Sequence, residues 1–270
     1  MSQQAPIVRL LIILGCLALV VAALAGMYSL AGVIIEQASV TPTPEPTAEP
    51  TPTPEPTATP IPVVLAETED MGQEYIDKFV FIGNSITYRM ASEYILPFSQ
   101  VWVPIMGTMS LGNVLITDIN YYPPDDIDNP VEMSIEEAAA LRKPEYVMIT
   151  LGTHDASWMT EDQLKDIYIQ LVRQIQRNSP DTKIICNSIL PVGEQIIDPA
   201  ENIHNAEIIV ANEWIRDVAE ITGTRFLNSF EVMVDETGNM PVEFSPYDGI
   251  HLTDAGYNTL FKYIRTHAYQ

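Results

Sequence analysis

The sequence is poor in cysteine. Its 270 residues contain two, Cys16 and Cys186. Cys16 lies in an uncharged apolar run near the N-terminus, whereas Cys186 lies in an apolar stretch of the C-terminal part. The C-terminal part therefore cannot form a disulfide within itself, and its roughly 200 residues are enough to bury a core without one. We expect Cys186 to be a packed core thiol.

Basic residues are also scarce. Lysine and arginine together number 13 against 36 aspartates and glutamates, which gives a net charge of −23. From Val63 onward there are 12 basic and 32 acidic side chains, a net charge of −20. Such a surface repels nucleic acid and anionic lipid, so nucleic acid is not expected as a partner. It favours neutral or cationic substrates, although a need for solubility explains the acidity equally well.

Residues 10–35 carry no charged side chain. A helix of this length rises about 39 Å, which exceeds the hydrocarbon core of about 30 Å. Arg9 precedes the run and Glu36 follows it, so residues 1–9 are expected in the cytoplasm and the C-terminal part outside. We predict a single-pass membrane helix at residues 10–35. The alternative is a cleaved signal peptide, whose apolar region is normally only about 7–15 residues long.

A segment rich in proline and threonine follows the apolar run. Residues 41–62 read TPTPEPTAEPTPTPEPTATPIP. Proline at nearly every second position removes backbone donors and favours an extended polyproline II chain. At about 3.1 Å per residue, such a stalk could hold a domain roughly 70 Å from the bilayer. We assign residues 36–70 to an extracellular linker and residues 71–270 to the folded domain.

The folded domain contains short apolar runs that are typical of buried strands. Helical patterns separate them and begin at recognisable caps: Ser134 with Glu137 and Thr160 with Gln163 match capping boxes, and Thr253 can cap a last helix. Strands alternating with helices predict an α/β fold with a parallel sheet covered on both faces. The expected strands are residues 79–83, 101–106, 146–151, 183–190 and 225–227, and a further helix is expected over residues 205–222, ending at Gly223.

Polar residues stand where the chemistry of a parallel sheet is expected, at the carboxyl ends of its strands. Ser85 follows the first strand at the start of a helix, and His154 follows the strand at 146–151. Near the C-terminus, Asp248 and His251 are three residues apart, so the carboxylate can meet one ring nitrogen and leave the other to take a proton from a serine. Each residue also has an ordinary structural interpretation: a helix-capping serine, a loop aspartate and a surface histidine.

Three segments together resemble the SGNH (GDSL-type) hydrolase family. FIGNSIT resembles the family's first block, LGTHD its third block and DGIHLTDAGY its last block. The glycine of the second block best matches Gly107 in PIMGTMS, with Gly112 as a poorer candidate. The similarity covers about residues 75–267. It implies a three-layer α/β/α sandwich with a mostly parallel five-stranded sheet, the flavodoxin-like SGNH hydrolase fold.

The resemblance also implies roles for individual residues. Ser85 would be the nucleophile, His251 the general base and then acid, and Asp248 the residue that orients His251. The backbone N–H groups of Ser85 and Gly107 would bind the oxyanion. His154 stands where the family has an asparagine whose amide is the third oxyanion donor. The imidazole of His154 therefore either replaces that donor or leaves the oxyanion-binding site weaker. This chemistry requires no cofactor and no metal.

The expected substrate is an acylated carbohydrate or another small ester. We predict an extracytoplasmic serine ester hydrolase that removes small acyl groups, such as acetyl, from a cell-wall or extracellular polysaccharide. The alternatives are an O-acyltransferase acting on cell-wall glycan and a non-catalytic glycan-binding module. Four large side chains flank the predicted site and either line an acyl or sugar pocket or serve ordinary packing: Met106, Met109, Trp158 and Met159.

Overall fold

The computed structural model describes residues 62–123, 125–194 and 202–270. All of them lie in one compact unit that extends from Thr59 to Gln270. The predicted cytoplasmic segment 1–9, the predicted membrane helix 10–35 and most of the predicted linker lie outside the described residues. Within the described residues, no helix combines the length and the apolar character that a membrane span requires.

The core of the unit is a five-stranded parallel sheet with strand order β2-β1-β5-β6-β7. The first strand, β1, is wholly buried, which is why its sequence FVFIG shows no alternation of polar and apolar residues. The predicted α/β class and the parallel five-stranded sheet are therefore confirmed. The strands are β1 (Phe79–Gly83), β2 (Val101–Trp102), β5 (Tyr146–Thr150), β6 (Lys183–Asn187) and β7 (Arg225–Leu227).

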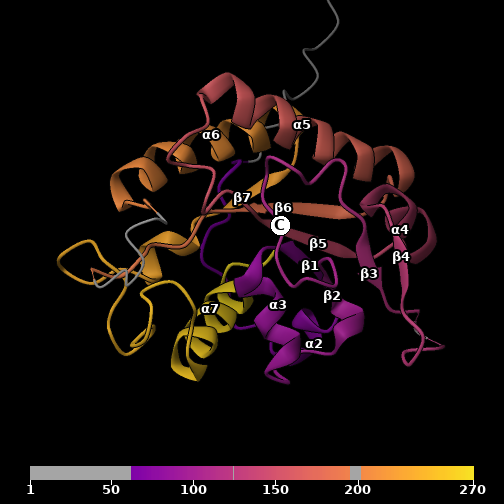
Figure 1. Ribbon diagram of the computed structural model, residues 1–270, viewed down its shortest axis with the longest axis horizontal. Helices are drawn as coiled ribbons and strands as arrows, with labels where there is room; N and C mark the ends of the chain where they lie inside the picture. Colours follow the sequence, from indigo (N-terminus) through magenta and orange to yellow (C-terminus); the bar gives the residue numbers. More distant parts are fainter. Residues whose placement is uncertain (1–61, 124, 195–201) are drawn as a thin grey trace, which may run out of the picture. The chain divides into compact units, whose positions relative to one another are not determined.

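Helices cover both faces of this sheet (Figure 1). The long helices α5 and α6 lie together on one side, and α2, α3 and α7 lie on the other. Their inward residues are buried, which gives the three layers that two-sided apolar strands require. The helices are α2 (Gln73–Ile76), α3 (Ser85–Ser92), α4 (Ile135–Arg142), α5 (Glu161–Asn178), α6 (Asn205–Thr222) and α7 (Asp254–Thr266).

The helix ends follow the predicted caps. Ser134 accepts a hydrogen bond from the N–H of Glu137, whose carboxylate accepts from the N–H of Ser134, and Thr160 forms the same reciprocal pair with Gln163. Helix α6 ends at Gly223, which adopts a left-handed conformation with φ of 70°. These interactions are local, so the sequence was sufficient to predict them.

Two strands are shorter than predicted. The run at 101–106 forms a strand only at Val101–Trp102, because the chain turns at Pro104, whose carbonyl accepts from the N–H of Gly107 at 2.8 Å. The run at 183–190 leaves the sheet after Asn187, because the N–H of Ile189 donates to the side chain of Asn212 on α6 instead of to a strand. Beyond the second strand, residues 188–190 stay buried in a loop, which explains why the apolar run continues there. Beyond the first, Val103 and Pro104 are buried, whereas Ile105 and Met106 are exposed.

A two-stranded antiparallel sheet was not predicted. It pairs β3 (Ile119–Tyr121) with β4 (Val131–Met133). Each strand has only three residues, and Val131 and Glu132 are exposed, so no apolar run marks this sheet in the sequence. It lies beside β2, at the edge of the main sheet.

The folded unit begins before the predicted boundary at residue 71. Phe226 of β7 exchanges hydrogen bonds with residues 63–65, donating to the carbonyl of Val63 and accepting from the N–H of Leu65. The N–H of Thr68 then donates to the carbonyl of Thr266, at the end of α7. Residues 63–65, assigned to the linker, thus pair with the free edge of β7, where unpaired strand groups need partners.

Candidate active site

Ser85 lies at the carboxyl end of β1, as the first residue of α3. Asn84 precedes it as the helix cap, and the side-chain oxygen of Asn84 accepts from the N–H of Ile86 at 3.0 Å. The first N–H groups of a helix have no acceptor within the helix, and they carry the positive end of its dipole. The N–H of Ser85 is one of these groups, so an anion beside Ser85 would be stabilised there.

The turn into α3 depends on Gly83. A Cβ atom on Gly83 would lie 1.9 Å from the hydroxyl oxygen of Thr87 and 2.9 Å from the carbonyl oxygen of Thr150. Both distances are shorter than any real contact, so only glycine allows α3 to pack this closely against β1 and β5. This close packing sets where Ser85 emerges from the sheet.

Three of the predicted site residues meet in one chain of hydrogen bonds. The Nε2 atom of His251 lies 2.8 Å from Oγ of Ser85, although the two residues are 166 positions apart. The Nδ1 atom of His251 lies 2.7 Å from Oδ2 of Asp248. All three side chains are only partly exposed. The order serine, imidazole, carboxylate is the arrangement in which histidine can take the serine proton.

The carboxylate of Asp248 is held by its neighbours. Its Oδ1 atom accepts from the N–H of Ile250 at 2.9 Å and from the N–H of His251 at 2.8 Å. Partial burial alone would raise the pKa of Asp248, but the hydrogen bonds from the backbone and ring of His251 and from Ile250 lower that pKa to about 2. A charged Asp248 requires a proton on Nδ1 of His251, which leaves Nε2 to accept from Ser85.

The family follows from a comparison of the whole sequence. A model of the GDSL-like lipase/acylhydrolase family matches residues 81–259, more than half of the 270-residue chain. The chain belongs to this family. It is an ester hydrolase, as the resemblance of the three sequence blocks implied. No curated protein matches the chain in sequence.

Solved structures share the fold of this acylhydrolase. The "putative platelet activating factor" of Streptococcus pneumoniae is 20% identical, with a TM-score of 0.52 over 75% of this chain and 93% of its own. A DUF4886 family protein from Bacteroides uniformis is 14% identical, with a TM-score of 0.51 over 71% of this chain and 83% of its own. At these identities the similarity extends to the fold alone.

The loop after β5 contacts the helix cap of Ser85. Nδ2 of Asn84 donates to the hydroxyl of Thr153 at 3.0 Å, and both side chains are buried. His154, the predicted third oxyanion donor, follows Thr153 and is partly exposed. Asn84 thus donates to one loop while it caps α3, a combination that an ionised aspartate, which has no side-chain donor, could not provide. Neither Thr153 nor its bond to Asn84 was predicted.

The two candidate glycines of the oxyanion hole already have acceptors for their N–H groups. Gly107 adopts φ of 73°, and its N–H donates to the carbonyl of Pro104 at 2.8 Å. The N–H of Gly112 donates to the carboxylate of Asp155 at 3.1 Å. Either glycine would have to share or release its present hydrogen bond to bind an oxyanion.

Large apolar side chains are exposed on the loops that carry the site residues. Met106 is 83% exposed in the loop after β2, Trp158 is 59% exposed in the loop after β5, and Tyr247 is 78% exposed beside Asp248. By contrast, Met109 and Met159 are buried, so ordinary packing accounts for these two. The exposed three offer apolar surface to a ligand that approaches this edge of the sheet.

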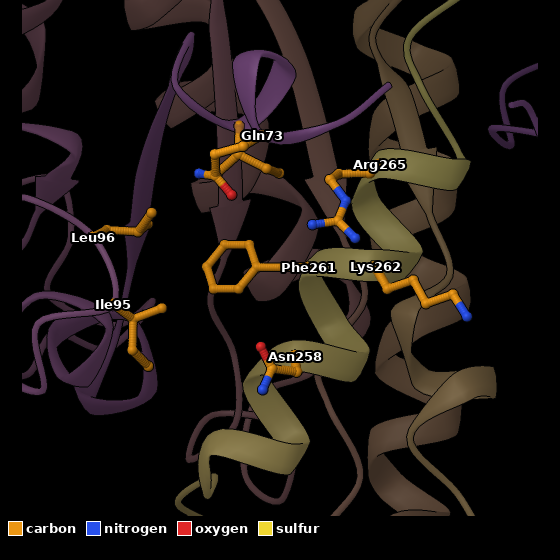
Figure 2. A pocket seen from close by; sticks show the side chains of 8 residues that line it. Gln73, Ile95, Leu96, Asn258, Phe261, Lys262 and Arg265 are labelled. Carbon is orange, nitrogen blue, oxygen red and sulfur yellow. The ribbon is translucent and has the colours of Figure 1, made fainter. Parts of the chain in front are cut away.

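A pocket of about 450 Å³ lies elsewhere on this acylhydrolase (Figure 2). Its walls come from α2, the segment after α3, and α7, and they include none of Ser85, Asp248 and His251. Figure 2 shows the ring of Phe261 facing Leu96, while the Lys262 side chain extends away. Arg265 at its rim is already paired with Asp70. The pocket is therefore distinct from the triad.

Proposed function

We propose that Ser85, His251 and Asp248 form the catalytic triad of this ester hydrolase. The observation that carries the proposal is the pair of contacts at 2.8 and 2.7 Å through the ring of His251. His251 takes the proton of Ser85 as the serine oxygen attacks the acyl carbon, and then gives that proton to the leaving alcohol. Water, activated by the same ring, releases the acyl group from Ser85 as a carboxylic acid.

The oxyanion formed in each step requires hydrogen-bond donors. The N–H of Ser85 at the start of α3 is one donor, and the imidazole of His154 is another. The N–H of Gly107 is also a candidate donor, and it must leave or share the carbonyl of Pro104 to take part. We therefore expect Gly107 to contribute less than Ser85 does.

The proposed substrate is an acetylated polysaccharide outside the cytoplasm. The apolar run at 10–35, with Arg9 before it, supports a membrane anchor, and the proline-rich segment 41–62 supports reach into a surrounding polymer layer. The acidic surface suits a neutral polymer. The exposed rings of Trp158 and Tyr247 suit the apolar faces of sugar rings.

The test is acetate release by the purified full-length protein from a chromogenic acetate ester and from an acetylated polysaccharide. Ser85→Ala should abolish both activities, while Ser92→Ala, at the other end of the same helix, should leave them intact. Turnover that survives in Ser85→Ala would refute the triad. Adding a deacetylated glycan as acceptor separates hydrolysis, which yields free acetate, from transfer, which yields an acetylated glycan.

A further inference from the structure

Asp155 is a buried acidic residue outside the triad. Asp155 is 1% exposed and lies in the loop after β5, one residue beyond His154. Burial raises the pKa of Asp155, and the hydrogen bonds from the N–H groups of Leu111 and Gly112 oppose that effect. A buried carboxyl group is costly unless its oxygens are satisfied, so its partners indicate what it does.

Both oxygens of Asp155 bind one short segment of the loop after β2. Oδ2 accepts from the N–H of Leu111 at 2.9 Å, and Oδ1 accepts from the N–H of Gly112 at 3.1 Å. The partners are 44 and 43 residues away in sequence. Hydrogen bonds to a charged acceptor are stronger than neutral ones, and two adjacent bonds also restrict orientation.

The loop after β5, which carries Asp155, is also hydrogen-bonded to the residue that precedes the proposed nucleophile. Thr153 accepts from Asn84, the residue before Ser85. A continuous path therefore runs from the helix cap of Ser85, through Thr153 and Asp155, to the segment Leu111–Gly112. The two loops joined by Asp155 carry His154 and Gly107, the two predicted oxyanion donors that are not on α3.

We propose that Asp155 is a positioning residue for the oxyanion hole. Its carboxylate holds the loop after β2 against the loop after β5, and so sets the separation of the groups that face the developing negative charge. This inference rests on the proposed function, because it assigns Asp155 an effect on the step that Ser85 performs. Small displacements of such groups matter, since about 1 Å can change a rate by roughly 100-fold.

Asp155 also supports an exposed ring. The carbonyl of Asp155 accepts from the N–H of Trp158 at 3.1 Å. A Cβ atom on Gly112 would lie 3.3 Å from Cη2 of Trp158, so the indole lies against the segment that the carboxylate holds. Loss of the hydrogen bonds to Leu111 and Gly112 thus frees the segment against which Trp158 packs, and it also separates the two loops.

The deciding variant is Asp155→Asn in the full-length protein. Its amide keeps the shape of the side chain but presents a donor to one of the two N–H groups, so one hydrogen bond becomes a repulsion. The matched control is Gln100→Leu. Gln100 is buried and donates to the carbonyls of Ile76 and Phe79, at the opposite end of β1 from Ser85.

The measurements are kcat and KM for the chromogenic acetate ester, with thermal unfolding of each variant. We expect kcat of Asp155→Asn to fall by roughly 10- to 100-fold, with KM for this small ester little changed. We expect Gln100→Leu to lose thermal stability and to keep wild-type kcat at temperatures where it is folded. Wild-type kcat in folded Asp155→Asn, or an equal loss in both variants, would overturn the proposal.

Hydrogen exchange separates this inference from the proposed function. If the wild-type protein hydrolyses the ester and Asp155→Asn matches it, only the positioning role fails. If the wild-type protein does not hydrolyse the ester, the triad proposal fails. Amide exchange across residues 105–116 then still tests whether Asp155 holds the two loops together. Faster exchange there in Asp155→Asn but not in Gln100→Leu supports this link between the loops, and unchanged exchange refutes it.

Discussion

The hydroxyl of Tyr257 donates a 2.7 Å hydrogen bond to the backbone carbonyl of Ile86. Ile86 follows Ser85, and Tyr257 lies in the first turn and a half of α7, the helix that begins three residues after His251. Tyr257 is buried, and this burial raises its pKa, so the hydroxyl stays protonated and can donate. One bond across 171 residues thus links the helix of the proposed nucleophile to the helix that follows the proposed base.

Tyr257→Phe removes this bond and keeps the ring. We expect a loss of about 0.5–1.5 kcal/mol in the free energy of unfolding, the usual net value of one hydrogen bond. We also expect a lower kcat, because α3 and α7 can then shift relative to each other. Urea unfolding and steady-state kinetics measure the two effects. The control is Tyr263→Phe. Tyr263 also lies on α7, but its hydroxyl donates to Glu231, which is outside that helix, so this variant should keep wild-type kcat.

Asp248→Asn should reduce kcat by about 10⁴-fold, because the neutral amide no longer requires the productive tautomer of His251. The kinetics of ester hydrolysis measure this loss. Asp235→Asn is the matched control, since the carboxylate of Asp235 also accepts a backbone N–H two residues on, from Thr237, but in an exposed turn. Comparable losses in both variants would mean that Asp248 acts only on the fold of its loop.

The charge of Asp248 should not change near neutral pH. Its folded pKa of about 2 lies below its usual value of 3.8, so its contribution to stability is complete above about pH 4 and is lost as the pH falls through about 2. Carbon NMR of the Asp248 carboxyl group should show a midpoint below pH 3. In His251→Ala the midpoint should rise, because the ring hydrogen bond is gone. A wild-type midpoint near 4 would contradict the hydrogen bonding at this loop.

His154 should be replaceable by an amide donor. His154→Ala is expected to lower kcat by about 10²–10³-fold, the usual effect of losing one oxyanion donor, whereas His154→Asn should retain most of it. His204→Ala, at an exposed position before α6, is the control. Equal kcat values for the alanine and asparagine variants would show that His154 is not a donor to the oxyanion.

Gly83→Ala should damage both stability and activity. The added methyl group would collide with Thr87 and with the carbonyl of Thr150, and overpacking of this kind costs about 1–3 kcal/mol. Because α3 must move away from β1, Ser85 should lose its contact with His251. Gly223→Ala is the contrast: nothing lies within 4 Å of its Cβ, so only the left-handed backbone costs roughly 1–2 kcal/mol and kcat should persist. Thermal unfolding and kinetics of both variants test this difference.

The features that the sequence predicted well depend on neighbours within a few residues. Short sequence patterns predicted the reciprocal caps at Ser134 and Thr160, the glycine that ends α6 and the wholly apolar strand β1. The family blocks added the residues that meet at the carboxyl end of the sheet. The weaker predictions concern segments whose partners lie elsewhere, such as residues 63–65 on β7 and the small sheet of β3 and β4.

By itself, the sequence determined the alternation of strands and helices, the caps and the residue types suited to ester hydrolysis. Only the tertiary structure decided which distant groups meet: Tyr257 with Ile86, and Asp155 with Leu111. The physical reason is range. Backbone preferences and caps act over about four residues, whereas these contacts exist only after the packed sheet brings distant loops to one edge.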